Sequence, residues 1–283
     1  MRLLLVGGSG MLGRAWRELL RTRPAWTCKA PTHAELDLLD PLSIERHVTP
    51  GVQTVVNCAA WTDVDAAEAR TDDADRLNGD AVGLLARRCA TVGATLLHYS
   101  TDYVFGGTQP GTPIPVDHPT QPTNAYGRSK LAGEGQALDS GCPLLLIRTS
   151  WLYAPWGKNF VRTIAQLARN RPKLRVVNDQ FGRPTSSEHL AQASLRLLEA
   201  DARGLFHLSD GGMCTWFDLA TAVAAHVNPD CKVEPCTSAE FPRPARRPAW
   251  SVLDLRATES LIGPRPDWRS TLSDVLPRLE GIA

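Results

Sequence analysis

The 283-residue sequence lacks any long apolar run and any marked excess of charge. No stretch reaches the ~18 uncharged apolar residues that are needed to cross a membrane. The short apolar run at the N-terminus ends in glycines, so we expect no signal peptide. Lys and Arg number 31 against 30 Asp and Glu, a net charge of +1. This balance gives no electrostatic case for nucleic acid, and we expect neither a nucleic-acid nor a membrane partner.

Paired cysteines are missing as well. The count of seven is odd and includes no Cys-x-x-Cys pair, with cysteines at positions 28, 58, 89, 142, 214, 231 and 236. The seven histidines show no metal-ligand spacing either. Such usage favours reduced thiols over a disulfide framework or a zinc site. We therefore expect a cytoplasmic protein without a structural metal.

A glycine-rich turn stands between the first predicted strand and the first predicted helix. The apolar run at 3–6 is typical of a buried parallel strand, and apolar residues recur at helical spacing over 12–20. Two glycine registers overlap in the turn, G-x-G-x-x-G at 8–13 and G-x-x-G-x-x-G at 7–13. Strand, glycine turn and helix in this order predict a dinucleotide site, in which the helix N-terminus binds a pyrophosphate. The alternative is a flexible turn without a ligand.

The carboxylate that usually binds the adenosine ribose is absent from its expected place. It stands ~20 residues after the glycines, at the end of the second strand. Here the predicted strand at 26–28 is followed by Lys29, and no carboxylate comes before Glu35. Lys29, or Arg14 just after the last glycine, would suit the 2′-phosphate of NADP. Both side chains are equally compatible with a solvated role, so NADPH and NADH both stay open.

Tyr126 and Lys130 lie four residues apart and so share one face of a predicted helix. A phenol has a pKa of about 10, which is too high for easy proton exchange near neutrality. A cation ~4 Å away would lower that pKa, with a Coulomb energy of about 4 kcal/mol at an effective dielectric constant of ~20. The pair thus indicates proton donation to an alkoxide. Alone, the same spacing also occurs by chance on surface helices.

Strand and helix patterns alternate through the first half of the chain. Further strands are predicted at 53–59, 94–99 and 144–149. This alternation predicts an α/β fold with a Rossmann-type, doubly wound parallel sheet. Polar and aromatic groups follow the strands at 60–62, 100–103 and 149–151. Since ligands bind beyond the carboxyl ends of such strands, we expect these groups to share a cleft.

The second half of the chain is less regular. It is predicted to hold helices at 160–168, 187–198 and 216–227, strands at 175–177 and 204–208, and a loop at 241–248. Ser186 is the predicted cap of the second of these helices. We expect 1–150 to be the dinucleotide-binding domain, with parts of 176–210 returning to it. The smaller C-terminal substrate-binding lobe is expected to comprise 151–175 and 211–283.

Several segments together resemble the extended short-chain dehydrogenase/reductase superfamily. The glycine turn at 7–13 and the Tyr-Lys segment at 125–134 are common to the whole superfamily. Ser-Thr-Asp-Tyr-Val-Phe at 100–105, Arg-Thr-Ser-Trp at 148–151 and Asp-Gln-x-Gly-x-Pro-Thr at 179–185 are similar to motifs of the dTDP-4-dehydrorhamnose reductase family. Matching segments run through nearly the whole chain. The resemblance implies reduction of the C4 ketone of dTDP-4-dehydro-L-rhamnose to dTDP-L-rhamnose by hydride transfer from NADPH or NADH.

The same resemblance implies roles for individual residues. Those implied to bind the cofactor are Gly7, Gly10, Met11, Leu12, Gly13, Asp37, Leu38, Ala60, Trp61, Thr62, Tyr126 and Lys130. Catalytic roles are implied for Tyr126 as proton donor, for Lys130, which holds the nicotinamide ribose and tunes Tyr126, and for Thr101 near the substrate carbonyl. Sugar binding is implied for Thr101, Asp102, Tyr103 and Trp151. Simpler roles stay open: a strand-end cap for Thr101, a core or lobe-contact tryptophan for Trp151 and a structural hydrogen bond for Asp102.

Other functions of this superfamily compete with the reductase. Sugar-nucleotide 4,6-dehydratases resemble one another in Thr-Asp-Glu, where this chain has Tyr103 in place of the glutamate, so the acid for water elimination is missing. Epimerases typically use a Cys or His, and neither Cys58 nor Cys142 is suitably placed. A non-enzymatic regulatory subunit of the same fold would need neither the glycine turn nor Tyr126 and Lys130. Another nucleotide-sugar reductase also stays open.

Some relatives are expected to dimerise through Mg²⁺ held by acidic side chains, one of them early in the first helix. Ala15 stands where that acid is expected, and Glu188 alone cannot build a multi-carboxylate site. The sequence therefore does not support Mg²⁺. We expect a monomer or weak homodimer that binds a dTDP-sugar.

Overall fold

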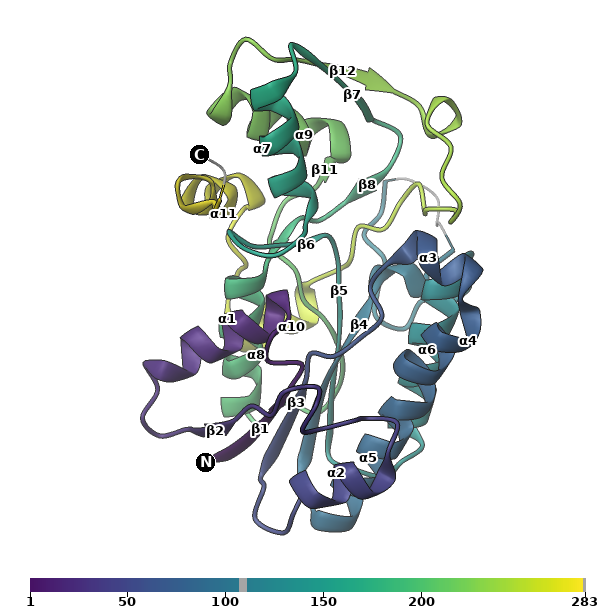
Figure 1. Cartoon of the computed structure of the whole chain (residues 1–283), viewed down its shortest axis with the longest axis vertical. Coiled ribbons are helices and arrows are strands. Elements are labelled where there is room, and N and C mark those ends of the chain that lie inside the picture. The colour runs from purple at the N-terminus through teal and green to yellow at the C-terminus, as the bar shows by residue number, and fades with distance from the viewer. Residues whose placement is uncertain (107–110, 282–283) are drawn as a thin grey trace.

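A parallel six-stranded sheet forms the base of the protein, and a smaller group of helices and short strands lies beyond the carboxyl ends of its strands (Figure 1). This computed structural model describes residues 1–106 and 111–281. The strands of the sheet are β1 (Arg2–Val6), β2 (Thr27–Lys29), β3 (Thr54–Asn57), β4 (Thr95–Thr101), β5 (Leu144–Thr149) and β10 (Gly204–His207). Their order is β10-β5-β4-β3-β1-β2, with every pair parallel. The predicted α/β, Rossmann-type fold is confirmed.

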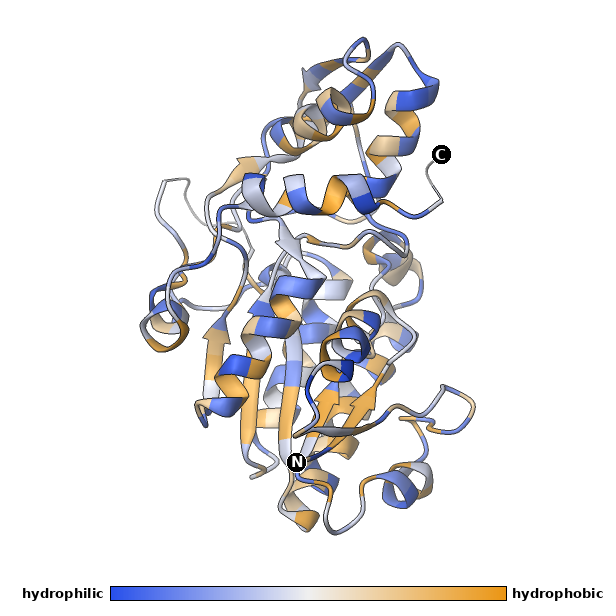
Figure 2. Cartoon of the chain, turned by 90° about the vertical axis from the view of Figure 1, so that its left-hand side faces the viewer, coloured by the Kyte–Doolittle hydropathy of each residue, from blue (hydrophilic) through white to orange (hydrophobic). Residues whose placement is uncertain are grey.

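Helices cover both faces of this sheet. One face carries α1 (Met11–Arg21), α8 (Ser187–Glu199) and α10 (Arg256–Ile262). The other carries α2 (Pro41–His47), α5 (Ala81–Val92) and α6 (Ala125–Leu138), with α3 (Val64–Ala69), α4 (Thr71–Asp75) and the π-helical turn η1 (Arg76–Asp80) beside α6. Figure 1 shows the two sets of helices on opposite sides of the strands. Layers on both faces explain why the inner strands are mostly apolar, as the orange stretches of the sheet in Figure 2 show.

Strand β1 shows how the sequence builds these two layers. Successive side chains of a strand point to opposite faces of the sheet. Leu3 and Leu5 accordingly pack into the core beneath α1 and α8. Leu4 and Val6 pack into the second core, beneath α2 and α5. All four side chains are at most 3% exposed, so one continuous apolar run supplies both cores.

The smaller part of the protein has an apolar core of its own. Its elements are α7 (Phe160–Asn170), β7 (Lys173–Val177), β8 (Phe181–Gly182), β11 (Cys214–Thr215), α9 (Trp216–Val227), β12 (Lys232–Cys236) and α11 (Trp268–Val275). The short strands β6 (Leu152–Tyr153) and β9 (Thr185–Ser186) connect it to the sheet, and the 3₁₀ turns are η2 (Asp102–Val104), η3 (Ser238–Glu240) and η4 (Leu276–Arg278). β10 returns to the large sheet beside β5, and Ile262 of α10 packs into the core beneath α1. The exact domain boundaries stay a prediction.

Most sequence-predicted elements agree with these bounds, and the differences have local causes. The bounds of β5 and α9 are as predicted, and α9 begins with a capping box between Thr215 and Asp218. β4 continues two residues past its predicted end, to Thr101, because hydrogen bonding with β5 continues to Thr149. Ser186 does cap α8 by position, but its side chain makes no capping hydrogen bond.

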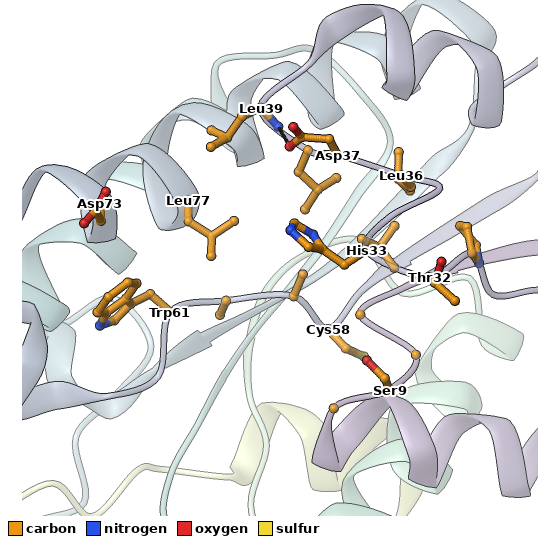
Figure 3. Close-up of a pocket in the computed structure, with 18 of the residues that line it drawn as sticks. Ser9, Thr32, His33, Leu36, Asp37, Leu39, Cys58, Trp61, Asp73 and Leu77 are labelled. Carbon is orange, nitrogen blue, oxygen red and sulfur yellow. Dashed lines mark hydrogen bonds between the residues drawn. The ribbon is translucent and has the colours of Figure 1, made fainter.

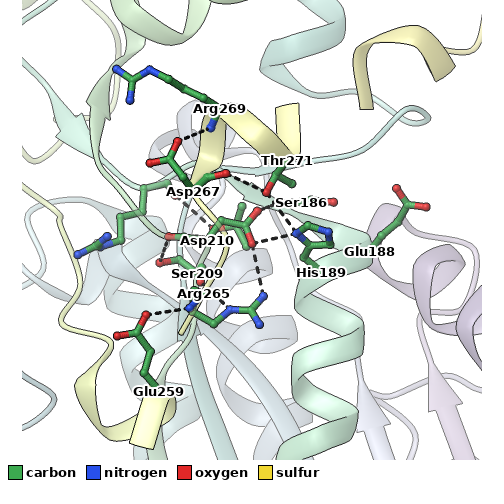
Figure 4. A network of polar contacts seen from close by, with 12 residues as sticks. Ser186, Glu188, His189, Ser209, Asp210, Glu259, Arg265, Asp267, Arg269 and Thr271 are labelled. Atoms are coloured by element: carbon green, nitrogen blue, oxygen red, sulfur yellow. Dashed lines mark hydrogen bonds and ion pairs between the residues drawn. The ribbon is translucent and has the colours of Figure 1, made fainter. Parts of the chain in front are cut away.

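A buried carboxylate ties the smaller part to the large sheet. Asp210 is fully buried just after β10 and accepts a hydrogen bond from the Ser186 amide at 3.0 Å. Its other contacts are Arg265 Nη2 at 3.4 Å and His189 Nδ1 at 3.3 Å (Figure 4). Thr271 of α11 also lies 3.3 Å from His189 Nδ1. Because an unpaired buried charge would be costly, this network fixes the start of α8 against the C-terminal segment.

We predict that His207 makes the fold sensitive to acid. Both ring nitrogens lack hydrogen-bond partners in the described part of the chain, and burial, assisted by Arg148, lowers the pKa of His207 to about 3. In the unfolded chain the ring binds a proton below pH ~6.5, so the folded state loses stability as the pH falls from there toward 3. From pH 6.5 to 4, His207 would remove about 3 kcal/mol of unfolding free energy.

Urea unfolding of the wild type and of His207→Leu over this pH range would test the effect. The variant should lose less unfolding free energy on acidification, whatever its stability at pH 7. Parallel pH profiles would contradict the assignment.

Candidate active site

The glycine turn after β1 is built around close backbone contacts. Gly7 has φ +73°, and a Cβ there would lie 2.6 Å from the Ala59 nitrogen. A Cβ at Gly13 would lie 2.1 Å from the Gly7 carbonyl oxygen. The Gly10 amide donates to that carbonyl at 3.0 Å, and α1 begins at the next residue with no side-chain cap. The first amides of α1 are therefore free for an anionic group, which fits the predicted pyrophosphate site.

Two adjoining cavities open beyond this turn. The first, of about 550 Å³, lies between the ends of β1, β2 and β3. The second, of about 620 Å³, extends toward β4, β5 and the smaller part of the protein. Both are lined by Ser9, Gly10, Cys58, Ala59 and Ala60. The two therefore form one cleft at the point where the strand order reverses, as expected for a dinucleotide site.

The first cavity has the size and lining of a nucleoside site. It contains the predicted residues Gly7, Asp37, Leu38 and Trp61. Figure 3 shows His33 directed into the cavity, which the sequence analysis did not assign. The segment after β2 thus approaches the cleft through Thr32 and His33.

The two basic residues proposed for a 2′-phosphate are not found in this cavity. Arg14 makes an ion pair with Glu280, with its nitrogens 2.6 and 2.9 Å from the carboxylate, and lies 4.3 Å over the Trp156 ring. Lys29 does not line the cavity in the described structure. The partner of Arg14 stands 266 positions away in the sequence, so local spacing gave no sign of it.

The second cavity brings the predicted reactive side chains together. It is lined by Met11, Leu12, Thr62, Thr101, Asp102, Tyr103, Tyr126, Lys130 and Trp151. Gly13 is the one predicted site residue that lines neither cavity, because it packs against the backbone of Gly7 and Gly8 in the turn. These residues come from the ends of β1, β3, β4 and β5 and from α6, in agreement with the expected common cleft.

Thr101 ends β4 inside this cavity. Its hydroxyl donates to Asp102 Oδ1 at 3.1 Å and accepts from the Tyr103 amide at 3.2 Å. The cap role left open for Thr101 is therefore present. Tyr103 meets the Tyr126 ring edge-on, with centroids 5.6 Å apart. This contact fixes the orientation of the Tyr126 phenol at the cavity wall.

The pKa of Tyr126 differs from the prediction. Burial raises it to about 12, with Asp102 adding to the rise and a hydrogen bond with Thr101 opposing it. Lys130 is not among the groups that shift it. Lys130 Nζ instead donates to the Tyr99 carbonyl oxygen at 2.6 Å and also lies 3.4 Å from His98 Nε2. The expected lowering of the Tyr126 pKa by Lys130 is thus not seen.

Lys130 itself is only 2% exposed. Burial lowers its pKa to about 8, and Glu134 one turn further along α6 opposes the shift. Glu134 is held by Arg148 of β5 through two hydrogen bonds of 2.7 and 2.9 Å. The amine therefore changes charge just above neutral pH, which is typical of functional rather than surface lysines.

Asp102 is a second perturbed group in the cavity. Its side chain is 1% exposed, and Oδ2 has no hydrogen-bond partner among the described residues. Burial raises the pKa of Asp102 to about 6. Hydrogen bonds with Ser251 and Thr101 oppose this rise. Asp102 thus lines the cavity as a carboxyl group whose protonation state changes close to neutral pH.

Trp151 holds a strained backbone conformation at the far side of the cavity. Its φ is +48°, which is uncommon for a bulky residue. The indole stacks on Trp216 of α9 with centroids 3.5 Å apart, and Gly182 lies directly beneath it, since a Cβ there would come within 2.4 Å of the ring. Trp151 therefore both contacts the smaller part of the protein and lines the cavity, so the alternative of a core or lobe-contact tryptophan stays open beside the sugar-binding role.

A buried asparagine positions the loop that follows β3. Asn78 accepts from the Trp61 amide at 2.9 Å and donates to the Trp61 carbonyl and to Ser129. Asn78 belongs to the π-helical turn η1, and such turns are frequent at functional sites. Because Ser129 immediately precedes Lys130 on α6, Asn78 fixes Trp61 relative to the part of α6 that carries Lys130.

Several cleft residues were missed by the sequence analysis. Those most relevant to chemistry are His33, Asn57, Arg70, Tyr99, Lys158 and Trp216. Asn57 and Tyr99 lie within predicted strands but were given no role, whereas His33, Arg70, Lys158 and Trp216 reach the cleft through tertiary packing that their spacing does not mark. In the part of the chain that the structure describes, no group of three or more His, Cys, Asp or Glu could hold a metal ion. The same residues include no helix long and apolar enough to span a membrane.

The comparisons with known proteins decide the family. A family model described as the RmlD substrate binding domain matches residues 1–280. The chain belongs to the RmlD substrate binding domain family. It is 38% identical over 284 residues to a dTDP-4-dehydrorhamnose reductase from Mycolicibacterium smegmatis, covering 99% of this chain and 86% of that protein. The predicted resemblance to this group of reductases is confirmed.

Solved structures agree with the RmlD family assignment. A dTDP-4-dehydrorhamnose reductase from Clostridium acetobutylicum matches with a TM-score of 0.94 and 34% identity, over 99% of this chain and all of that one. A reductase of the same name from Bacillus anthracis, in complex with NADP, gives a TM-score of 0.91 at 31% identity and covers 98% of each chain. The extended short-chain dehydrogenase/reductase fold is therefore shown by overall structure as well as by motif.

We predict that Gly13→Ala disrupts the turn. The new Cβ would lie 2.1 Å from the Gly7 carbonyl oxygen, and backbone cannot yield as a flexible side chain can. We expect a loss of stability of about 1–3 kcal/mol and an affinity for NADPH at least tenfold lower. Calorimetric titration and thermal unfolding would measure both.

Gly135→Ala is the matched control, because nothing lies within 4 Å of a Cβ at that position of α6. It should bind NADPH like the parent. Equal NADPH affinities for the two variants would show that cofactor binding does not require glycine at position 13.

Proposed function

We propose that this chain reduces the C4 ketone of dTDP-4-dehydro-L-rhamnose to dTDP-L-rhamnose with NADPH or NADH. The observation that carries the proposal is the single cavity shared by Tyr126, Lys130 and Thr101 with the free start of α1. A ketone reductase needs a proton donor beside the nicotinamide, and this cavity adjoins the phosphate turn. The family membership and the NADP complex of a relative support the same reading.

Each part of the cleft would hold a different part of the cofactor. The first amides of α1, at Met11 and Leu12, suit the pyrophosphate, with Gly7, Gly10 and Gly13 allowing its close approach. The cavity beside Asp37 and Leu38 suits the adenosine. Ala60, Trp61 and Thr62 lie between the two cavities, toward the nicotinamide half. When bound, the reduced nicotinamide supplies the hydride.

Tyr126 and Thr101 would manage the charge on the substrate oxygen. When a ketone carbon gains hydride, negative charge develops on its oxygen. Tyr126 has a pKa of about 12 in the free protein, so its phenol carries a proton throughout the neutral range. It gives that proton to the alkoxide, while the Thr101 hydroxyl, which donates to Asp102 Oδ1 in the structure, would turn to donate to the same atom. Both donors are neutral, so neither adds a permanent charge that would retain the product.

Lys130 would act on the cofactor and on Tyr126 together. Lys130 lines the cavity, where nicotinamide ribose hydroxyls would become alternative acceptors to the Tyr99 carbonyl oxygen. An ammonium that turns toward the ribose also approaches the phenol one turn earlier on α6. It would then stabilise the phenolate that remains after proton transfer.

The sugar would be bound at the β4 and β5 side of the cavity. Asp102 and Tyr103 line the cavity there, and the Asp102 carboxylate would accept a hydrogen bond from a sugar hydroxyl once its side chain turns toward the cavity. Trp151, supported by Trp216, presents an aromatic face of the kind that packs against the apolar face of a sugar ring. These assignments extend the sugar-binding set implied by the family.

We further propose a cytoplasmic monomer or weak homodimer. The seven cysteines are all free in the structure, which suits a reducing compartment. Glu188 makes an ion pair with Arg278, with the closest atoms 2.8 Å apart, and is therefore engaged within its own chain. With Ala15 in the first helix, this arrangement favours neither a magnesium bridge nor a dimer built on one.

Tyr126→Phe should abolish most turnover. The variant retains the ring contact with Tyr103 but has no proton to donate, so kcat for the 4-keto sugar should fall by at least a hundredfold. The NADPH dissociation constant should stay within about threefold of the parent. Absorbance of the nicotinamide would follow turnover, and activity within a few-fold of the parent would exclude the proton-donor role.

Lys130→Met should weaken NADPH binding and remove its pH dependence. In the parent the ammonium is present below pH ~8 and is lost as the pH rises through that value, so affinity should fall there. Methionine carries no charge at any pH, so its binding should be weaker and flat from about pH 7 to 9. An unchanged affinity and an unchanged pH profile would count against both roles of Lys130.

A further inference from the structure

A chain of three buried polar side chains leads from the cleft wall to Lys130. Asn57 ends β3, His98 lies on the neighbouring β4, and Lys130 approaches from α6. Their exposed fractions are 1%, 0% and 2%, so these side chains are shielded from bulk solvent and each depends on its protein neighbours for hydrogen bonds. Asn57 Nδ2 lies 3.2 Å from His98 Nδ1, and Lys130 Nζ lies 3.4 Å from His98 Nε2. The ring nitrogens of His98 therefore face one neighbour each.

The orientation of Asn57 decides which ring nitrogen carries the proton. Its Oδ1 accepts from the Ala59 amide at 3.0 Å, which leaves the amide nitrogen Nδ2 facing His98. An amide NH₂ group can only donate, so His98 Nδ1 must offer its lone pair. Burial keeps the pKa of His98 well below its usual value, and a charged Lys130 would lower it further, so the ring is neutral in either form of the lysine. A neutral ring with a bare Nδ1 carries its proton on Nε2.

This tautomer is compatible with only one form of Lys130. The Nε2–H group of His98 points at Lys130 Nζ, and an ammonium has three donors but no lone pair. A neutral amine can accept a hydrogen bond from His98 Nε2–H and still donate to the Tyr99 carbonyl oxygen at 2.6 Å. The arrangement of Asn57 and His98 is therefore that of the uncharged lysine.

We propose that His98 is a positioning residue that couples the charge on Lys130 to the cofactor-cleft wall at Ala59, through Asn57. When Lys130 takes one proton from solvent, Nε2 must become the acceptor, and the ring proton moves to Nδ1. Asn57 then turns its oxygen toward Nδ1–H and releases the Ala59 amide. One proton enters, the ring keeps one proton, and no electrons move.

The released amide lies at the most sensitive point of the cleft. Ala59 lines both cavities, and its nitrogen is the atom against which Gly7 is packed. The charge on Lys130 would thus alter the cavity wall beside the glycine turn as well as the nicotinamide side of the cleft. This coupling rests on the proposed role of Lys130 toward the cofactor.

Other ionisable groups near this chain do not replace His98 in the coupling. Glu134 faces Lys130 from one turn along α6, but its carboxylate is held by Arg148. The Tyr99 phenol accepts from Trp16 Nε1 at 2.9 Å, and its pKa is raised well above the usual value by burial. Burial likewise raises the pKa of the Cys58 thiol, and Tyr126 stays protonated in the same range. Only Lys130 changes charge near pH 8 among them.

Nitrogen NMR of the histidine ring tests the proposal without any assay of activity. Long-range proton–nitrogen correlation on ¹⁵N-labelled protein reports which nitrogen of His98 is protonated. In the wild type the proton should move from Nδ1 to Nε2 as the pH rises through about 8. In Lys130→Met the ring should keep its proton on Nε2 at every pH, because only Asn57 then decides. One tautomer at all pH values in both proteins would overturn the proposal.

Asn57→Asp supplies a second test with the opposite outcome. A carboxylate accepts from the Ala59 amide and from Nδ1–H together, so it should fix the proton on Nδ1 and leave Nε2 bare at all pH values up to about 9. Asn78→Asp is the matched control, since Asn78 is also a buried asparagine at the cleft but bonds Trp61 and Ser129. It should keep the wild-type tautomer change. A tautomer change that Asn57→Asp leaves unaltered would exclude Asn57 from the coupling.

Calorimetric titration with NADPH then separates this proposal from the proposed function. Proton uptake on binding near pH 8 should occur in the wild type and be lost in Asn57→Asp.

If the tautomer changes as expected but the 4-keto sugar is not reduced, the coupling stands and the assigned reaction fails. If the sugar is reduced while His98 keeps one tautomer, the reaction stands and the coupling fails.

Discussion

The close approach of two backbone turns is the constraint on which the cleft depends. The turn after β1 and the turn after β3 meet where Gly7 packs on the nitrogen of Ala59, and only a residue without a Cβ fits there. Because β1 and β3 are adjacent in the sheet, this contact places the start of α1 directly beside the wall of both cavities. The phosphate site and the reactive site thus share a single boundary, with no loop between them.

Burial has opposite effects on the two principal ionisable groups of the cleft. It stabilises the neutral form of each, which raises the pKa of Tyr126 and lowers that of Lys130. The phenol consequently stays protonated, while the amine is poised to change charge near neutral pH. Tyr126 is therefore available as a proton donor throughout the neutral range, whereas the charge on Lys130 depends on the pH near 8.

The sequence allowed the sheet, the glycine turn and the Tyr126–Lys130 pair to be predicted, because each depends on local periodicity or spacing. β5 and α9 agree with their predicted bounds for the same reason. The hydrogen bond from Lys130 to the Tyr99 carbonyl oxygen could not be foreseen, because it depends on how deeply α6 is seated against β4. The pairing of Arg14 with Glu280 and the stacking of Trp151 on Trp216 join residues from distant parts of the chain. Spacing within a motif carries no information about such contacts.

The stacked pair of indoles has a spectroscopic consequence. Trp151 follows β5 of the large sheet, whereas Trp216 begins α9 of the smaller part, and their rings lie 6° from parallel. Two indoles so close together couple their electronic transitions, and the resulting circular dichroism depends on their mutual angle. A built-in pair of chromophores therefore spans the two halves of the molecule, so any rotation between those halves would change the near-ultraviolet signal of the unlabelled protein.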